Sequence, residues 1–408
     1  MKCGLLGKKL GHSYSPQIHR YLGDYPYDLY EKTPEQLPEF LQHGDFTGLN
    51  VTMPYKKDVM AYCSALSPRA KALNAVNVLV RQPDGTLIGH NTDYYGFETM
   101  LRNTGLSVSG KKVLVLGSGG ASNTAVAVLQ AHDARVVVIS RSGENHYGNL
   151  QLHADASVIV NTTPVGMYPN TGESAVDLEL FPHLEGVLDV VYNPARTQLL
   201  LDAEKRGLVT ANGLLMLVAQ AKEAAEWFTG QPIPEDRVTF IHKALRSQME
   251  NIILIGMPGS GKSTVGRLLA EMTGKKFIDA DAFLVQTAGT SIPEIFASHG
   301  ETAFRALETQ ALKELGCQSG LIIATGGGCV TREENYPLLH QNGTIFYLDR
   351  AIEKLPVDGR PLSQNASLSQ MYQLRKPMYD RFADHHIDNN DDAQCAATRI
   401  LKNWEERE

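Results

Sequence analysis

The residues best suited to chemistry form a glycine-rich segment in the second half of this 408-residue sequence. Its residues Gly256-Met257-Pro258-Gly259-Ser260-Gly261-Lys262-Ser263 match the pattern G-x-x-x-x-G-K-[ST]. An apolar run precedes it and helical spacing follows it, as this motif requires. Glycine adopts φ values that other residues rarely take, so backbone N–H groups can surround phosphate oxygens. The motif predicts a nucleotide-phosphate loop, with Lys262 at the β- and γ-phosphates and the Ser263 hydroxyl on Mg²⁺. The expected nucleotide contacts are Gly259, Ser260, Gly261, Lys262, Ser263 and Thr264.

Polar residues also stand where predicted strands end in the first hundred residues. Ser13 and Ser15 precede Pro16, a residue that favours the first turn of a helix, so their hydroxyls and the helix N-terminal amides could hold an anion. A capped helix start without a ligand is the alternative. More polar groups end the apolar strands within 48–56 and 73–93. Because α/β folds bind ligands at strand ends, these groups predict a small-molecule site.

A second glycine loop lies between these two regions. A buried strand at 111–116 runs into Gly117-Ser118-Gly119-Gly120-Ala121-Ser122 and then a helix at 124–131, which predicts a Rossmann entry, although its sixth position is serine. The next strand, at 134–139, ends in Ser140-Arg141-Ser142. A guanidinium between two hydroxyls suits the 2′-phosphate of NADPH, whereas NAD enzymes usually carry an acidic residue here. The sequence therefore favours NADPH.

Length and composition indicate what kind of protein must position these groups. A chain of 408 residues predicts two or three domains, and 43% apolar residues is ordinary for a globular protein. The net charge of −7 argues against nucleic-acid or membrane-surface partners, and no apolar run approaches the length of a membrane span. The five scattered cysteines form no C-x-x-C pair, which favours a reducing compartment over zinc binding. Since the start lacks a signal-peptide pattern, we expect a cytoplasmic protein.

Taken together, the motifs of the first 245 residues resemble the shikimate dehydrogenase family. The resemblance implies that Lys56 and Asp93 form the catalytic pair, because a charged lysine beside an aspartate can polarise a ketone and protonate the alkoxide that hydride addition creates. A surface ion pair is the alternative. Ser13 and Ser15 are implied to bind the substrate carboxylate. The other implied substrate ligands are Thr52, Asn77, Tyr192 and Gln220. The implied contacts of NADPH are Gly117, Gly119, Gly120, Ala121, Ser140, Arg141, Ser142 and Gly213.

This half departs from the family pattern in two places. Only residues 143–156 separate Ser142 from the next strand, where the family normally has a helix, a strand and a short helix, so we expect a trimmed Rossmann sheet. Asn212 and Leu215 stand where the family usually has aspartate and glycine. The helix that follows them, which runs to Phe228, is expected to pack back onto the first domain.

Residues from 251 nearly to the end resemble shikimate kinase, which implies ATP as the phosphoryl donor. In that family's pattern Asp279 lies on the Mg²⁺ side with Ser263, while Asp281 holds ring hydroxyls and helps to deprotonate the nucleophile. Gly327, in a run of three glycines, is implied to contact substrate through its backbone.

Three arginines complete the resemblance to the kinase. Arg305 and Arg375 are implied to clamp the carboxylate of shikimate, a task that suits their forked donors. Arg360 is implied to reach the transferring phosphate when a lid closes. The lid segment between Asp349 and Arg360 is shorter than the family usually carries, and basic residues often found there are missing.

The sequence thus predicts an α/β protein with an N-terminal α/β substrate domain, a Rossmann NADP-binding domain and a parallel P-loop domain of the nucleoside-monophosphate-kinase type. The expected bounds are 1–100 with 213–245 for the substrate domain, 101–212 for the Rossmann domain and 250–408 for the P-loop domain. The two resemblances imply NADPH-dependent reduction of 3-dehydroshikimate to shikimate, followed by phosphorylation with ATP and Mg²⁺ to shikimate 3-phosphate. The expected partners are these small molecules, and the oligomeric state stays open, a monomer included.

Two alternatives remain for the function. The first half could be a quinate/shikimate dehydrogenase that uses NAD. One half could instead be a non-catalytic regulator that binds shikimate, although Lys56, Asp93, Lys262, Ser263 and Asp281 are all present.

Overall fold

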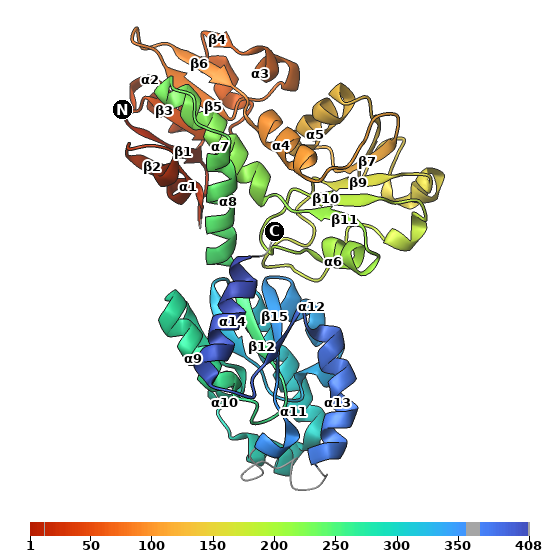
Figure 1. Cartoon of the computed structure of the whole chain (residues 1–408). Coiled ribbons are helices and arrows are strands. Elements are labelled where there is room, and N and C mark those ends of the chain that lie inside the picture. The colour runs from red at the N-terminus through yellow and green to blue at the C-terminus, as the bar shows by residue number, and fades with distance from the viewer. Residues whose placement is uncertain (12, 356–367, 407–408) are drawn as a thin grey trace. The chain divides into compact units, whose positions relative to one another are not determined.

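The computed structural model describes residues 1–11, 13–355 and 368–406 and divides the chain into two compact units (Figure 1). Unit 1 comprises Met1–Gly166, Glu173–Tyr192 and Leu199–Ala244. Unit 2 comprises Met167–Gly172, Asn193–Gln198 and Leu245–Glu408. Both units are built of sheets with helices packed on their faces, so the predicted α/β class is confirmed. Within the described ranges, no helix is long and apolar enough to cross a membrane.

The first sheet of unit 1 has six strands in the order β2-β1-β3-β5-β6-β4. β5 runs antiparallel to both of its neighbours, and the other pairs are parallel. The strands are β1 (Cys3–Gly7), β2 (Tyr27–Glu31), β3 (Gly48–Val51), β4 (Ala65–Leu66), β5 (Val78–Arg81) and β6 (Leu87–His90). One face packs on α2 (Leu37–His43), the 3₁₀ helix Asp58–Tyr62 and α3 (Pro68–Leu73). The other face of this sheet packs on α1 (Ser15–Leu22) and α7 (Leu214–Thr229).

The second sheet of unit 1 is fully parallel, in the order β11-β10-β9-β7-β8. Its strands are β7 (Lys112–Leu116), β8 (Arg135–Ile139), β9 (Val158–Asn161), β10 (Gly186–Asp189) and β11 (Val209–Ala211). Helices α4 (Asp93–Asn103) and α5 (Gly120–Ala131) cover one face. The other packs on α6 (Gln198–Lys205) and the 3₁₀ helices Tyr147–His153 and Leu178–Leu180.

The expected trimming of this sheet is confirmed. Residues 142–157 contain no strand and only the 3₁₀ helix Tyr147–His153, so β8 forms the edge of the sheet. A further parallel strand needs a crossover of a dozen or more residues, and an interval this short cannot hold both.

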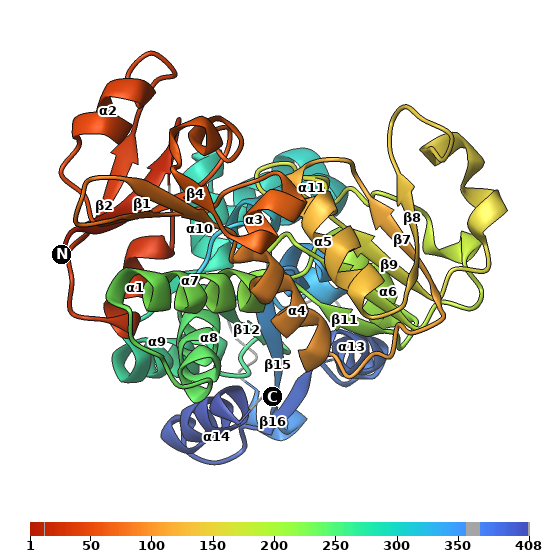
Figure 2. The ribbon, with the colours of Figure 1, turned by 90° about the horizontal axis from the view of Figure 1, so that it is seen from above.

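Helices α4 and α7 pack against each other and connect the two sheets of unit 1 (Figures 1 and 2). Gly96 allows this close approach, because a Cβ at that position would lie 2.6 Å from the carbonyl oxygen of Met216. α7 also packs on α1, as the sequence predicted. It ends at Gly230, which has a φ of 66°, and α8 (Asp236–Met249) follows.

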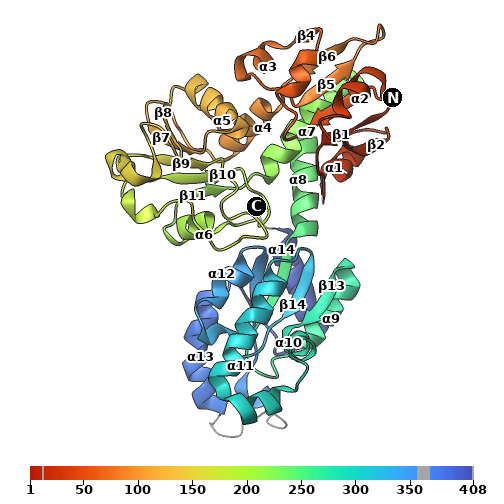
Figure 3. The same cartoon turned by 180° about the vertical axis from the view of Figure 1, so that it is seen from behind.

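Unit 2 contains one parallel sheet of five strands in the order β13-β14-β12-β15-β16 (Figure 3). The strands are β12 (Asn251–Ile255), β13 (Lys276–Asp279), β14 (Leu321–Ala324), β15 (Gly343–Asp349) and β16 (His385–Asp388). Both faces are covered, which explains why β12 and β15 read as nearly continuous apolar runs. Helices α9 (Lys262–Thr273) and α14 (Ala393–Glu405) cover one face. The other packs on α11 (Ile292–Gly316), α12 (Asn335–His340) and α13 (Leu368–Phe382).

A capping box begins α11. The Ser291 hydroxyl accepts from the backbone of Glu294, whose carboxylate in turn accepts from the backbone of Ser291. α11 is one long helix with a break at Gly300, which has a φ of 75°. α10 (Ala280–Ala288) comes directly before this segment, and a 3₁₀ helix at Cys329–Thr331 and another at Ile352–Lys354 complete the unit.

Candidate active sites

An ion pair lies at the centre of the predicted substrate site in unit 1. The Nζ of Lys56 donates to Oδ2 of Asp93 at 2.6 Å, and the two side chains are 27% and 16% exposed. Lys56 lies in the turn that follows β3, next to Tyr55, which is fully buried and anchors that turn. Asp93 is the first residue of α4. The pair is therefore held by buried backbone while it stays open to a ligand, which argues against a loose surface ion pair.

The buried side chain of Asn77 joins this pair to the other predicted ligands. Its amide donates to Oδ1 of Asp93 and to Oγ1 of Thr92, each at 3.0 Å, and lies 3.4 Å from Oε1 of Gln220. Its own oxygen accepts from the Thr92 backbone at 2.7 Å. Segments before β5, after β6 and on α7 thus converge on one point. Thr92 is fully buried and was not predicted from the sequence, where a threonine beside a strand end is too common to stand out.

The two predicted serines lie at the start of α1. The backbone N–H of Ser15 donates to Oγ of Ser13 at 3.2 Å. Between them, Tyr14 packs edge-on against Tyr192, with ring centroids 6.2 Å apart, and this contact brings the Tyr192 segment to the serines. Burial raises the pKa of Tyr192, so its hydroxyl stays protonated and can donate to a ligand. Thr52 follows β3, and its backbone donates to the carbonyl of Leu6 at 2.9 Å.

A polar cluster that was not predicted from the sequence contacts Ser15. The Tyr27 hydroxyl donates to Oδ1 of Asn50 at 2.8 Å and also bonds the Ser15 hydroxyl. His19 stacks on the Tyr27 ring at 4.0 Å and bonds the Tyr25 hydroxyl at 2.7 Å. Burial lowers the pKa of His19 to about 3, so the imidazole is neutral. The one sequence signal was Asn50, a polar residue inside the apolar strand β3.

The predicted dinucleotide loop has the conformation that a phosphate site needs. Gly117 has a φ of 106°, and α5 begins at Gly120 with no side chain capping its first N–H groups. A Cβ at Gly119 or Gly120 would meet nothing within 4 Å, so a ligand can approach the backbone directly. These features fit a pyrophosphate at a helix N-terminus. Ala121 follows in the first turn of α5.

Two further cofactor predictions lie at the ends of this sheet's strands. Ser140, Arg141 and Ser142 follow β8, where the Ser140 hydroxyl donates to the carbonyl of Ser142 and the Arg141 side chain is exposed. Gly213 precedes α7, where a Cβ would lie 2.0 Å from the carbonyl oxygen of Val190. Only glycine fits there.

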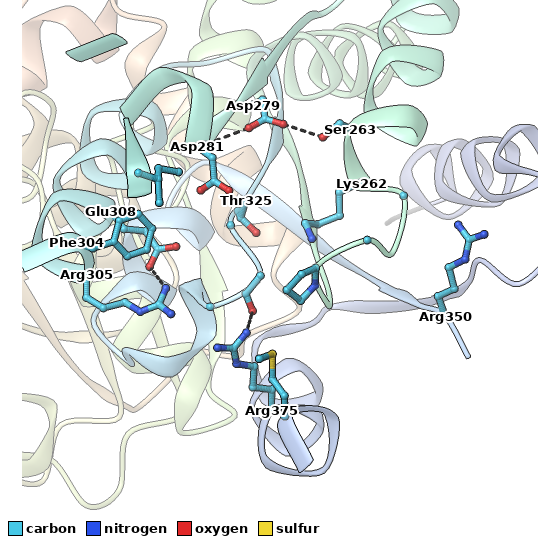
Figure 4. A pocket seen from close by; sticks show the side chains of 18 of the residues that line it. Lys262, Ser263, Asp279, Asp281, Phe304, Arg305, Glu308, Thr325, Arg350 and Arg375 are labelled. Carbon is cyan, nitrogen blue, oxygen red and sulfur yellow. Dashed lines mark hydrogen bonds and ion pairs between the residues drawn. The ribbon is translucent and has the colours of Figure 1, made fainter. Parts of the chain in front are cut away.

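In unit 2 a cavity of about 860 Å³ contains the phosphate loop and the predicted substrate residues together (Figure 4). The loop has three glycines with positive φ, Gly256, Gly259 and Gly261. Nζ of Lys262 donates to the carbonyls of Gly256 and Met257 at 2.9 and 3.0 Å, so the lysine lies against its own loop. Ser260 lies in the same loop, and Thr264 lies in the first turn of α9.

The predicted metal ligands are hydrogen-bonded to each other. Oγ of Ser263 donates to Oδ2 of Asp279 at 2.7 Å. Oδ1 of Asp279 caps α10 by accepting from the backbone of Asp281 at 3.1 Å, so the carboxylate is held in place. A hydroxyl and a carboxylate oxygen are the hard donors that Mg²⁺ prefers, with the remaining positions filled by water and phosphate. The residues present therefore fit this ion.

The predicted carboxylate clamp lies at the other end of the cavity. Nη1 of Arg305 donates to Oε2 of Glu308 at 2.7 Å, and Nη2 donates to Glu301 at 3.2 Å. Nη1 of Arg375 donates to the carbonyl of Gly327 at 3.1 Å. Figure 4 shows both guanidinium groups near the glycine segment, with Asp281 between the clamp and the loop. Arg360 lies outside the described residues.

Glu308 is a second residue that the sequence reading missed. It is buried, and burial raises the pKa of its carboxyl although the Arg305 guanidinium opposes the shift. Its spacing of three residues after Arg305 on one helix was the available signal. Burial raises the pKa of Cys329 to about 12, so its thiol stays protonated within the apolar core of unit 2.

Fold and sites together define a nicotinamide-dependent dehydrogenase joined to a phosphate-loop kinase. Two family models match the chain: the shikimate dehydrogenase substrate binding domain at residues 5–79 and shikimate kinase at residues 258–405. A shikimate dehydrogenase (NADP(+)) of Clostridium perfringens is 36% identical over 265 residues, which cover 60% of this chain and 97% of that protein. The chain belongs to the shikimate dehydrogenase family and carries a C-terminal shikimate kinase domain.

Solved structures agree with this assignment for the first part of the chain. Shikimate 5-dehydrogenase of Thermus thermophilus, in complex with NADP(H) and shikimate, is 29% identical with a TM-score of 0.55, covering 60% of this chain and 99% of that one. Quinate dehydrogenase of Corynebacterium glutamicum, in complex with NAD, is 26% identical with the same TM-score and the same coverage.

Proposed function

We propose that this chain is a bifunctional enzyme of the shikimate pathway. Unit 1 reduces 3-dehydroshikimate to shikimate with NADPH, and unit 2 transfers the γ-phosphoryl group of ATP to the 3-hydroxyl of shikimate. The observation that carries the first activity is the convergence of Lys56, Asp93, Asn77 and Gln220 at one point. For the second it is the single cavity that holds both the phosphate loop and the arginine clamp. The product of the first reaction is the substrate of the second.

In the proposed reduction, the Lys56 ammonium donates a hydrogen bond to the ketone oxygen and then gives its proton to the alkoxide that forms there. Asp93 orients the lysine through their bond of 2.6 Å. Asn77 and Gln220 orient the ring hydroxyls, while Ser13 and Ser15 hold the carboxylate. NADPH, when bound, supplies the hydride.

The proposed choice of NADPH rests on Arg141, whose exposed guanidinium follows β8. The alternative is a quinate/shikimate dehydrogenase that uses NAD, and it predicts little role for this arginine. Changing Arg141→Ala should lower kcat/KM with NADPH by about 10- to 100-fold, the range for one charge-assisted bond, while activity with NADH changes little. Arg135→Ala, at an exposed arginine of the same strand, is the control. An equal loss with both cofactors would contradict the assignment.

In the proposed phosphoryl transfer, Asp281 accepts the proton of the attacking hydroxyl, and Arg305 and Arg375 fix the carboxylate. Lys262 moves from its loop carbonyls to the phosphates when the nucleotide binds. Ser263 and Asp279 would hold Mg²⁺, which neutralises phosphate charge when bound.

The direct test supplies purified protein with 3-dehydroshikimate, NADPH and MgATP and identifies the products by mass spectrometry. Shikimate 3-phosphate is the expected product. Shikimate that accumulates without phosphate would contradict the kinase assignment, and unchanged 3-dehydroshikimate would contradict the dehydrogenase assignment. Binding of shikimate without any turnover would support the alternative in which one half is a regulator. We further propose a cytoplasmic location, which the five free cysteines favour.

A further inference from the structure

An arginine with no partner among the described residues lies beside the phosphate loop. Arg350 directly follows β15 and lines the cavity of unit 2. Its Nε is buried without a hydrogen-bond partner, and no hydrogen bond or ion pair joins its guanidinium to any residue that the structure describes. Its Nη1 lies 3.6 Å from the position that a Cβ on Gly261 would take. Figure 4 shows Arg350 on the loop side of the cavity, far from Arg305.

The other cations that line this cavity already have protein partners. Lys262 bonds two carbonyls of its own loop, and Arg305 bonds Glu301 and Glu308. Arg375 bonds the carbonyl of Gly327, and Lys354 bonds the carbonyl of Asn390. A partly buried guanidinium without a partner is unfavourable unless a ligand supplies the missing acceptors. Among the described residues that line this cavity, Arg350 is thus the cation left available for an anion.

The backbone around Arg350 is tied to the phosphate loop, so its position is set before any ligand binds. The side-chain amide of Asn389 donates to the carbonyl of Ser260 at 2.5 Å, and the backbone of Asn389 donates to the carbonyl of Asp349 at 2.8 Å. On the other side, the backbone of Ala351 donates to Oδ1 of Asn390 at 2.8 Å. These bonds connect the residues on both sides of Arg350 to the loop through one short segment.

We propose that Arg350 binds the α- and β-phosphates of the nucleotide and so determines nucleotide affinity in unit 2. Gly261 belongs to the part of the loop whose N–H groups surround these phosphates, and Arg350 lies next to it. The carboxylate clamp at Arg305 lies elsewhere in the cavity, so Arg350 contributes to nucleotide binding and not to shikimate binding. This role rests on the proposed kinase function.

The test measures binding of MgADP and of shikimate to the full chain by calorimetry. Arg350→Gln should weaken MgADP binding by about 10- to 100-fold, as loss of a charge-assisted bond predicts, and leave shikimate binding unchanged. Arg350→Lys should keep most of the affinity, because an ammonium also binds phosphate. Arg332→Gln is the matched control, since it removes the same charge from a half-buried arginine that pairs with Glu334 and does not line the cavity. NADPH-dependent reduction reports that each variant is folded.

Each other outcome overturns a specific statement. MgADP binding by Arg350→Gln within twofold of the wild type would overturn the role of Arg350 while the kinase function stands. An equal loss in Arg332→Gln would show a general charge effect and overturn the direct contact. A loss in Arg350→Lys as large as in Arg350→Gln would overturn the phosphate contact in favour of stacking on the base. Absence of MgADP binding to the wild type would overturn the kinase function itself.

Discussion

Nζ of Lys56 and Oδ2 of Asp93 lie 2.6 Å apart although 37 residues separate them in the chain. One follows a strand in the middle of the first sheet, and the other begins the helix that leads towards the second sheet. The amide of Asn77 bonds the other carboxylate oxygen of Asp93, Oδ1, so the carboxylate cannot turn away from the lysine without losing that bond.

Replacing Lys56 by methionine should therefore abolish reduction. Removing the proton donor is expected to lower kcat by about 10²- to 10⁴-fold, the usual contribution of a positioned acid or base. Steady-state kinetics of NADPH oxidation measure this loss, and phosphorylation of added shikimate should be unchanged. Lys57→Met is the control, because Lys57 is the exposed neighbour in the same turn. A loss of both activities in folded protein would contradict the assignment of separate sites.

The reciprocal change is Lys262→Ala in the phosphate loop. It should reduce phosphoryl transfer by a comparable factor, because it removes the lysine's positive charge from the β- and γ-phosphates. Reduction of 3-dehydroshikimate should continue at the wild-type rate. Lys276→Ala, at an exposed lysine at the start of β13, should leave both activities intact. Equal kinase rates in Lys262→Ala and wild type would refute the phosphate-loop role.

Gly328 tests whether the position of Arg305 sets affinity for shikimate. A Cβ at Gly328 would lie 2.2 Å from Nη2 of Arg305, so Gly328→Ala must displace a guanidinium that Glu301 and Glu308 now hold. We expect KM for shikimate to rise by about tenfold or more, while MgADP binding stays unchanged. The double variant Gly328→Ala/Arg305→Ala should have a KM for shikimate little higher than that of Arg305→Ala alone, because the effects of two coupled substitutions do not add. Additive effects would contradict this explanation.

The stability of unit 1 should decrease as the pH falls below about 6.5, the usual pKa of histidine. Burial lowers the pKa of His19 to about 3, so the unfolded chain binds a proton there that the folded chain does not. Stability from this group is fully present above pH 6.5 and is lost towards pH 3, at up to about 1.4 kcal/mol per pH unit.

The variant His19→Phe, which can still stack on Tyr27, should show a smaller dependence of unfolding free energy on pH. Urea unfolding followed by Trp227 fluorescence in a Trp404→Phe background reports on unit 1. His43→Gln, at an exposed histidine at the end of α2, should keep the wild-type slope. A slope in His19→Phe equal to that of the wild type would show that His19 is not the group responsible.

Much of the fold and of both sites could be predicted because each depends on local pattern. The strand, glycine loop and helix around Lys262 form one continuous segment, so spacing alone predicted their structure. The trimmed Rossmann sheet followed from the length of residues 143–156, since too few residues remain for a strand and its crossover.

The supporting residues could not be found in this way. His19, Asn50 and Glu308 have their roles because burial removes water from them and places a particular partner within hydrogen-bond distance. Neither the burial of these residues nor the identity of their partners can be inferred from the local sequence, because a single histidine or asparagine can occupy many different environments. The same holds for Arg350, which is one arginine among many until the fold places it beside Gly261 with no partner in the part of the chain that the structure describes.

The sequence by itself thus determined the class of each half, the chemistry of its main side chains and the loops that bind phosphate, because these depend on residue type and short-range spacing. Only the tertiary structure decided which groups meet. Asn77 links Asp93 to Gln220, and Lys56 pairs with Asp93, because the segments after β3, before β5 and after β6 converge with α7. That convergence is a property of sheet order and helix packing, which bring distant segments together and fix the distances on which the proposed chemistry depends.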